Sequence, residues 1–205
     1  MSRSPNVSKA VGICGGTGSG KSTLVKGLQK ALPNQVVLIQ QDDYLVPNEE
    51  IPKLEGWMNY EHPKAWDGQR VAHDIAELRN GRPVKVYAKD HSKTEVYGGR
   101  APRKWVTREP KPIVLVEGFL ILAYPEVRGQ LAWSFFLQAP FEVHMGRRIH
   151  FINEEYRQEV LEPMHAKYVE SKKRYANEIV PVGELSAKQV LSQVLARMKE
   201  RGIGG

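Results

Sequence analysis

The feature that most constrains the fold is a glycine-rich octet at residues 15–22. It reads Gly-Gly-Thr-Gly-Ser-Gly-Lys-Ser, satisfies the pattern G-x-x-x-x-G-K-[ST] in full, and is followed by Thr23. An apolar run at 11–14 precedes it, and residues 22–32 carry apolar side chains at helical spacing. This strand–turn–helix context predicts a P-loop, in which backbone N–H groups surround phosphate oxygens at the positive end of a helix dipole.

The residue types within this loop indicate separate roles. We expect Lys21 to reach the β- and γ-phosphates of a nucleotide and the Ser22 hydroxyl to bind Mg²⁺. Glu117 follows a buried apolar run, where a parallel sheet gathers its ligands, so we expect it to complete the metal site. The predicted ATP-binding residues are Gly15, Gly16, Thr17, Gly18, Ser19, Gly20, Lys21, Ser22 and Thr23.

Short apolar runs alternate with helical patterns along the whole chain. The expected strands are 11–14, 36–39, 84–87, 113–116, 134–138 and 179–182, and the expected helices are 22–32, 65–79, 142–152, 154–174 and 186–201. Most of these strands are apolar on both faces, which predicts an α/β fold: a P-loop NTPase-type parallel sheet with helices on both faces. A single domain, 1–205, is expected, with substrate-side excursions at 44–63 and 84–111 that form a small cap.

Composition limits the possible partners. The chain has 30 basic and 23 acidic residues, for a net charge of +7, and the basic excess is concentrated in 1–35 and 82–111. Such an excess suits a polyanionic ligand, either a nucleotide or a nucleic acid. The longest apolar runs are too short to cross a bilayer, and the lone Cys14 favours a reducing, cytoplasmic compartment. No aromatic RNA-binding signature is present, which makes a nucleic-acid partner the weaker expectation.

A P-loop alone does not separate a GTPase, an ATP-driven machine and a small-molecule kinase. The chain lacks the N-K-x-D tetrapeptide by which GTPases read guanine. Asp42 and Asp43 directly follow the second predicted strand, where one carboxylate could face the γ-phosphate, orient an acceptor hydroxyl and take its proton. These two features favour a kinase.

Most of the chain resembles the uridine kinase and phosphoribulokinase family of P-loop kinases. The resemblance rests on residues 12–23, 41–44, 59–63 with 66–67, 81–87 with 91–93, 116–118, 147–149, 163–165 and 172–176. It implies an Mg²⁺-dependent nucleoside kinase that transfers the γ-phosphate of ATP, or of GTP, to the ribose 5′-hydroxyl of uridine or cytidine. The resemblance leaves the base, the donor and a homo-oligomeric state open.

The resemblance also implies roles for individual residues. Asp42 matches the catalytic aspartate, and Lys21 and Arg148 match groups that contact the transferring phosphate. Glu61 lies where an aspartate binds the ribose hydroxyls, and Tyr87 and His91 lie near positions that frame the base. The expected substrate-binding set is Asp42, Tyr44, Tyr60, Glu61, Tyr87, His91 and Arg148.

Three departures from the family pattern stand out. Glu61 is one methylene longer than the aspartate of the family, and Ala88 replaces the aspartate that follows the tyrosine. The lid region, 147–165, is shortened and lacks the arginine-rich R-D-x-x-E-R-G-R stretch. Arg147, Arg148 and Arg157 would therefore have to supply the positive charge over the γ-phosphate.

Two alternatives remain. Nicotinamide riboside kinases resemble this chain at 41–43, 117–120 and 135–142, and would perform the same transfer to a ribose with a different base. A more distant alternative is a non-kinase P-loop protein that binds RNA or acts as a regulatory ATPase. Nucleic-acid gel shifts with a salt titration would separate the distant alternative from a kinase.

Overall fold

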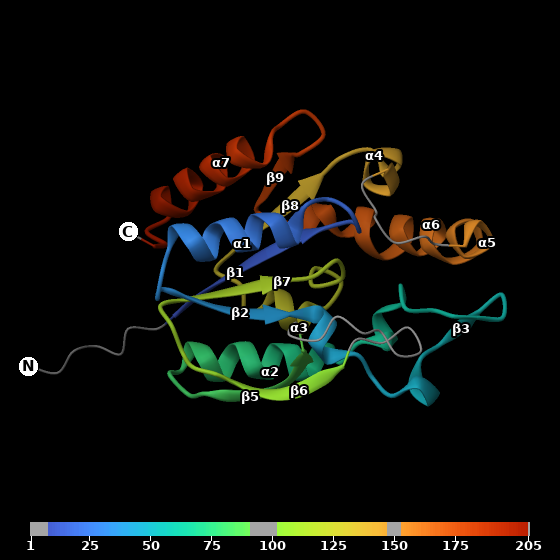
Figure 1. The fold of residues 1–205 in the computed structure, drawn as a ribbon, viewed down its shortest axis with the longest axis horizontal. Coiled ribbons are helices and arrows are strands. Elements are labelled where there is room, and N and C mark those ends of the chain that lie inside the picture. Colours follow the sequence, from blue (N-terminus) through green and yellow to red (C-terminus); the bar gives the residue numbers. More distant parts are fainter. Residues whose placement is uncertain (1–7, 91–101, 147–152, 205) are drawn as a thin grey trace, which may run out of the picture.

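Five parallel strands form the central sheet, in the order β2-β7-β1-β8-β9 (Figure 1). The computed structural model describes residues 8–90, 102–146 and 153–204. The strands are β1 Lys9–Gly15, β2 Val36–Gln40, β7 Ile113–Glu117, β8 Trp133–Gln138 and β9 Glu178–Pro181. The predicted α/β class with a parallel sheet is confirmed.

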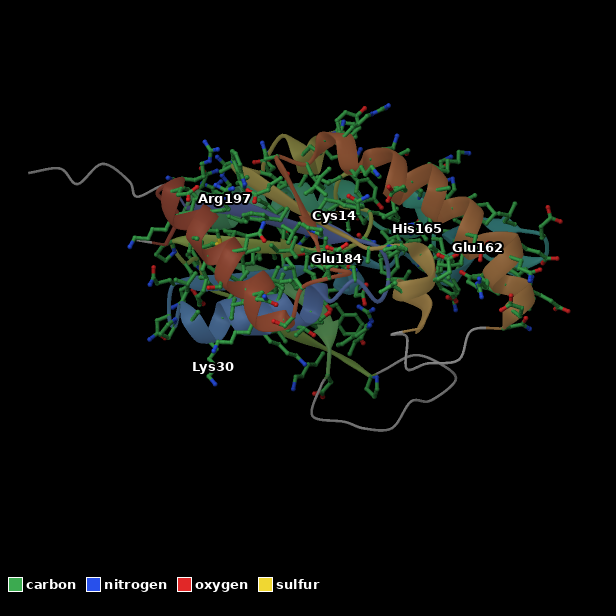
Figure 2. The ribbon with its side chains drawn as sticks, turned by 90° about the horizontal axis from the view of Figure 1, so that it is seen from above. Cys14, Lys30, Glu162, His165, Glu184 and Arg197 are labelled. Atoms are coloured by element: carbon green, nitrogen blue, oxygen red, sulfur yellow. The ribbon has the colours of Figure 1, made fainter. Side chains whose placement is uncertain are left out.

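Helices cover both faces of this sheet (Figure 1). They are α1 Lys21–Ala31, α2 Gly68–Arg79, α3 Pro125–Arg128 and α7 Ala187–Glu200. Lys30 marks α1 and Arg197 marks α7 in the view from above, and these two helices contact each other (Figure 2). Within the described ranges, no helix combines the length and apolar character needed to span a bilayer.

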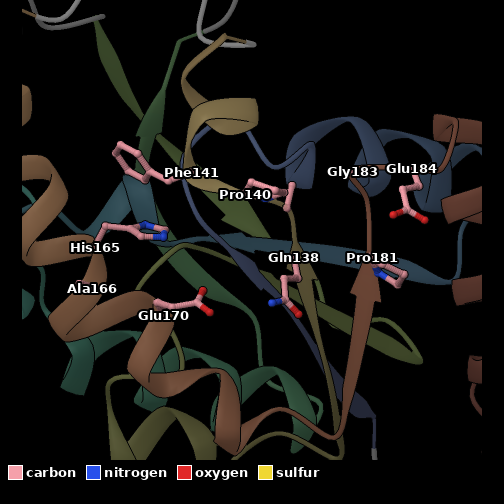
Figure 3. A pocket seen from close by; sticks show the side chains of 10 residues that line it. Gln138, Pro140, Phe141, His165, Ala166, Glu170, Pro181, Gly183 and Glu184 are labelled. Carbon is pink, nitrogen blue, oxygen red and sulfur yellow. The ribbon is translucent and has the colours of Figure 1, made fainter.

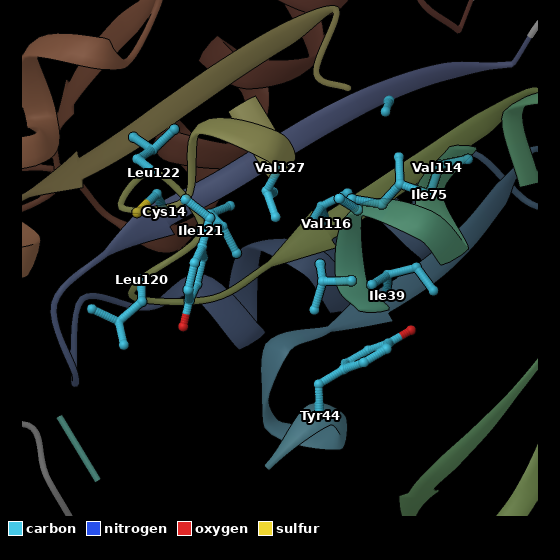
Figure 4. Close-up of a cluster of buried hydrophobic side chains, with 14 of the residues drawn as sticks. Cys14, Ile39, Tyr44, Ile75, Val114, Val116, Leu120, Ile121, Leu122 and Val127 are labelled. Carbon is cyan, nitrogen blue, oxygen red and sulfur yellow. The ribbon is translucent and has the colours of Figure 1, made fainter. Parts of the chain in front are cut away.

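Alternation along β1 explains why both faces need covering. Val11 and Ile13 pack into a cluster with the buried side chains of α1 and α7. Ala10 and Cys14 point the other way, into a cluster with α2 and α3 that Figure 4 shows in close-up. Successive side chains of a strand face opposite sides, so a strand buried on both faces has a continuous apolar sequence.

One helix prediction was wrong at its start, and another is described only in part. Helix α2 begins at Gly68 rather than at residue 65, because the Asp67 carboxylate caps it by accepting from the backbone N–H of Arg70 at 2.8 Å. Residues Pro63–Ala65 form a separate 3₁₀ turn instead. Helix α4 covers Phe141–Gly146, and the remainder of the expected helix at 142–152 lies outside the described residues.

The helix expected at 154–174 is an uninterrupted helical path with irregular turns. It comprises α5 Glu154–Tyr156, a π-helical turn Arg157–Leu161, α6 Glu162–Met164, a second π-helical turn His165–Val169 and a 3₁₀ turn Glu170–Tyr175. Pro163 lies inside this path and has no N–H to donate, and the turns that precede and follow α6 are π-helical. The helical path nevertheless continues through the proline.

The two substrate-side excursions differ in structure. The first, after the 3₁₀ turn Gln41–Tyr44, contains a second 3₁₀ turn, Asn48–Glu50, and the short antiparallel pair β3 Lys53–Leu54 and β4 Trp57–Met58. The second contains an antiparallel hairpin outside the main sheet, β5 Val84–Lys89 and β6 Arg103–Arg108. Val84, Val86 and Ala88 of β5 are buried in the same cluster as α2, which holds the hairpin against that helix.

A buried hydrogen bond ties the end of β2 to α2. The Tyr44 hydroxyl donates to Asp74 Oδ2 at 3.0 Å, and Asp74 is completely buried. The other oxygen of this carboxylate contacts Arg70 Nε at 2.9 Å and His73 Nδ1 at 3.1 Å. Burial and the neighbouring Asp74 raise the pKa of the Tyr44 hydroxyl, which keeps it protonated as a donor.

We expect Asp74→Ala to destabilise the protein by about 1–3 kcal/mol, because the Tyr44 hydroxyl loses its acceptor inside the core. Tyr44→Phe should cost less, about 0.5–1.5 kcal/mol, since Asp74 keeps Arg70 as a partner. Urea denaturation measures both, with the exposed Gln69→Ala on the same helix as control. A smaller loss for Asp74→Ala than for Tyr44→Phe would contradict this account.

Candidate functional site

The P-loop connects β1 to α1 with a backbone that only glycine adopts easily. Gly15, Gly18 and Gly20 have φ angles of 146°, 75° and 90°. A Cβ on Gly15 would lie 2.6 Å from the Leu137 carbonyl oxygen, so a side chain there would collide with β8. No side chain caps the start of α1, and its first turn contains no acidic residue. Its first N–H groups are therefore available to an anion.

Lys21 folds back over this loop. Its Nζ donates to the carbonyl oxygens of Gly15 at 3.0 Å and Gly16 at 2.8 Å. Desolvation lowers the pKa of the Lys21 ammonium, whereas the carboxylates of Glu117, Asp42 and Glu61 favour its charged form. Three carboxylates from separate segments thus act electrostatically on one lysine.

The two residues predicted to hold magnesium lie in direct contact. The Ser22 hydroxyl donates to Glu117 Oε1 at 2.7 Å, and Gln40 Nε2 donates to Glu117 Oε2 at 3.1 Å. A hydroxyl and a carboxylate are oxygen donors of the kind Mg²⁺ prefers, and this ion usually keeps waters and substrate phosphates as its other ligands. Among the described residues, no group of three His, Cys, Asp or Glu could hold a metal alone. The donor set therefore fits an ion that arrives with a nucleotide.

Asp42 and Asp43 are neighbours with different surroundings. Asp43 is buried, accepts from the Lys89 N–H at 3.1 Å, and lies 3.8 Å from Arg108 Nη2. Burial raises the pKa of Asp43, and the Lys89 N–H and the Arg108 charge oppose that rise. The Asp42 side chain is half exposed and makes an ion pair with Lys89 at 3.0 Å. Asp42 is thus the one of the two that a substrate can reach.

The other predicted substrate residues are dispersed. Tyr44 is buried with its hydroxyl bound to Asp74, so its phenol does not face a substrate. The Tyr60 carbonyl accepts from Trp66 Nε1 at 2.8 Å, and the Glu61 carboxylate acts electrostatically on Lys21.

Tyr87 is 47% exposed on the hairpin, with its ring centroid 5.3 Å from that of Trp105. Arg157 makes an ion pair with Glu162 at 2.8 Å and so already has a carboxylate partner. His91, Arg147 and Arg148 lie outside the described residues.

A cavity of about 440 Å³ opens at the carboxyl ends of β8 and β9 (Figure 3). Its lining includes Gln138, Pro140, Phe141, His165, Glu170 and Glu184. Desolvation lowers the pKa of the His165 imidazole, and the charge of Glu170, which raises it, outweighs that of Lys21, which lowers it. The volume of the cavity suits a small organic ligand or part of a nucleotide.

Sequence reasoning missed several residues that shape this site. Gln41 is buried, and its Oε1 accepts from the Leu120 N–H at 2.8 Å, which fixes the turn after β7. Gly118 leaves room for it, because a Cβ there would lie 2.4 Å from Gln41 Oε1. Lys89 and Arg103 reach Asp42 from the hairpin. A polar Gln41 directly after an apolar strand was the available signal, whereas no local pattern marks Lys89.

Comparison with known proteins places this geometry among kinases. A family model described as "Phosphoribulokinase / Uridine kinase family" matches residues 10–197. A uridine kinase from Clostridium botulinum (strain Okra / Type B1) is 34% identical over 185 residues, covering 84% of this chain and 87% of the relative. A uridine kinase from Bacillus velezensis is 31% identical over 198 residues, covering 89% of each.

Solved structures share the fold. A possible uridine kinase from Bacillus stearothermophilus superposes with a TM-score of 0.61 at 17% identity, covering 87% of this chain and 90% of the other. A putative fructose transport system kinase from Silicibacter sp. TM1040 has a TM-score of 0.59 at 20% identity, covering 87% and 92%. At these identities the likeness establishes the P-loop kinase fold.

We expect Glu117→Gln to weaken Mg²⁺-dependent nucleotide binding by roughly 10- to 100-fold, because the amide removes a charge from the metal site. Calorimetric titration of ATP with and without Mg²⁺ measures this, and metal-free binding should change little. The matched control is Glu126→Gln, at an exposed carboxylate on α3. Equal losses in both conditions would place Glu117 outside the metal site.

Proposed function

The chain belongs to the phosphoribulokinase / uridine kinase family, and from this premise we propose that it phosphorylates the 5′-hydroxyl of a pyrimidine ribonucleoside, with ATP as donor. The acceptor is supported by relatives named uridine kinase that are 30–34% identical to most of the chain. The reaction is supported by the residues around Lys21.

The donor side is supported by the P-loop and the adjoining cavity. Lys21 would contact the β- and γ-phosphates once these displace its bonds to Gly15 and Gly16. The base of the nucleotide would enter the cavity beside β8, where Phe141 offers an aromatic surface and Gln138 a polar group. Magnesium, when bound, neutralises charge on the β- and γ-phosphates, and Ser22 and Glu117 would hold it.

The position of Asp42 is the observation that carries the proposal. Its carboxylate lies on the 3₁₀ turn that follows β2, is half exposed, and acts electrostatically on Lys21. In transfer, the acceptor oxygen forms a bond to the γ-phosphorus as the bond from that phosphorus to the bridging oxygen breaks. Asp42 would orient the hydroxyl and accept its proton, which leaves ADP and the nucleoside monophosphate as products.

A coupled ADP-release assay tests the function across uridine, cytidine, adenosine, guanosine and nicotinamide riboside. We expect turnover with uridine and cytidine. A preference for nicotinamide riboside would show that the protein is a nicotinamide riboside kinase instead. An absence of turnover together with salt-sensitive RNA binding would show that it is an RNA-binding protein and not a kinase.

Lys21→Ala, purified in parallel, should lose roughly a thousandfold or more in turnover, because the lysine stabilises charge that develops in the transition state.

Asp42→Asn should lower kcat by about a hundred- to ten-thousandfold while ATP binding stays nearly unchanged, because the amide keeps the shape but cannot accept the proton. Asp43→Asn should act mainly on stability, since its carboxylate is buried against the hairpin. Turnover and thermal unfolding of both variants check this. A far larger loss of kcat in Asp43→Asn than in Asp42→Asn would show that Asp43, and not Asp42, accepts the proton.

Ribonucleosides should exceed 2′-deoxyribonucleosides by roughly ten- to a hundredfold in kcat/KM, because a carboxylate at Glu61 can accept from both ribose hydroxyls. Glu61→Ala should erase most of this preference and lower activity overall. Uridine and deoxyuridine are compared in the wild type and the variant. Equal efficiency of the two substrates in the wild type would exclude Glu61 as the residue that reads the sugar.

A further inference from the structure

The carboxylate of Asp42 is held by a residue that the family motifs leave unassigned. Lys89 Nζ lies 3.0 Å from Asp42 Oδ2, and the two side chains are 37% and 49% exposed. A carboxylate has two oxygens with about four lone-pair directions. The bond from Lys89 engages Oδ2, and the residues that the structure describes leave Oδ1 of Asp42 for another donor.

The main chain of Asp42 is held from the same hairpin. Arg103 Nη2 donates to the Asp42 carbonyl oxygen at 2.6 Å, and Nη1 of this guanidinium donates to the Tyr87 carbonyl at 3.1 Å. Lys89 and Arg103 are opposite each other in the β5–β6 register. Two cross-strand neighbours thus bind Asp42, one at its side chain and one at its backbone.

The base of the Lys89 side chain is itself fixed. The Lys89 N–H donates to the buried carboxylate of Asp43 at 3.1 Å. The alternate positions Val84, Val86 and Ala88 on β5 are buried in the apolar cluster with α2. The lysine therefore starts from a strand anchored at both the 3₁₀ turn and the helix, so its reach to Asp42 is geometrically defined.

We propose that Lys89 is a positioning residue that orients the Asp42 carboxylate toward the acceptor hydroxyl. This inference rests on the proposed function, in which Asp42 receives the proton of that hydroxyl. With Oδ2 tied to Lys89, rotation of the carboxylate is restricted and Oδ1 is presented to the acceptor. Small errors in the placement of a reacting group can cost about a hundredfold in rate.

If the Lys89–Asp42 salt bridge had a purely structural role, its loss would lower the unfolding midpoint and leave catalysis nearly unchanged. Ion pairs between partly exposed side chains contribute little to stability, because water and salt screen them. Loss of Lys89 should therefore leave the unfolding midpoint nearly unchanged while catalysis falls. Thermal unfolding measured beside kinetics separates the two roles.

The test is a double-mutant cycle on kcat. Lys89→Met should lower kcat by roughly 10- to 100-fold, with the KM for ATP within about twofold, and Lys89→Arg should restore most of the rate. Lys85→Met is the matched control, because it removes an exposed lysine from the same strand and should retain the wild-type rate. In an Asp42→Asn background, Lys89→Met should change kcat by less than about twofold, since its effect passes through Asp42.

Three results would overturn the inference. They are a wild-type kcat for Lys89→Met, an equal loss in the Asp42→Asn background, and a rise in the KM for the acceptor with kcat unchanged. The last would make Lys89 an acceptor-binding group.

Failure of the proposed function is seen separately, as a wild-type protein that phosphorylates no nucleoside. The same double-mutant cycle is then measured on the rate of ATP hydrolysis in the absence of an acceptor. There, an effect of Lys89→Met that disappears in the Asp42→Asn background supports the inference, and an effect that persists overturns it.

Discussion

The desolvated ammonium of Lys21 is the constraint on which the rest of the site depends. A cation removed from water requires compensation, and here two loop carbonyls and three carboxylates provide it. Glu117 ends β7, Asp42 follows β2, and Glu61 comes from the excursion beyond them. Strands β2, β7 and β1 are adjacent and parallel, so their carboxyl ends bring Glu117 and Asp42 to the start of α1. The order of the strands therefore brings these two carboxylates close to Lys21.

Much of this donor side was predictable from the sequence, because its signals are local. The buried parallel strands appear as apolar runs, and the P-loop is contiguous with the strand and helix that fix it. Strand-end carboxylates are likewise visible in order along the chain. The error arose where a side chain decided a boundary, because the Asp67 cap moved the start of α2 from residue 65 to Gly68.

The acceptor side was less predictable, because contacts between distant residues decide it. Lys89 meets Asp42 across 47 positions in the chain, and no spacing rule links an exposed strand lysine to a carboxylate so far away. Tyr44 belongs to a recognisable motif, yet Asp74 on α2 draws its hydroxyl into the core. A motif therefore indicated which residues matter in this segment, but burial decided which of them can reach a substrate.

The two neighbouring aspartates show how the hairpin and the sheet share the chemistry. On the 3₁₀ turn after β2, Asp43 is buried against β5, while Asp42 remains half exposed and pairs with Lys89. Asp43 attaches the hairpin to the sheet, and the hairpin returns Lys89 and Arg103 to Asp42. The residues predicted to bind phosphate lie on the sheet and α1, whereas the proposed acceptor-side carboxylate, Asp42, is bound by residues of β5 and β6. Changes within the hairpin can consequently alter acceptor geometry while leaving the P-loop, Ser22 and Glu117 as they are.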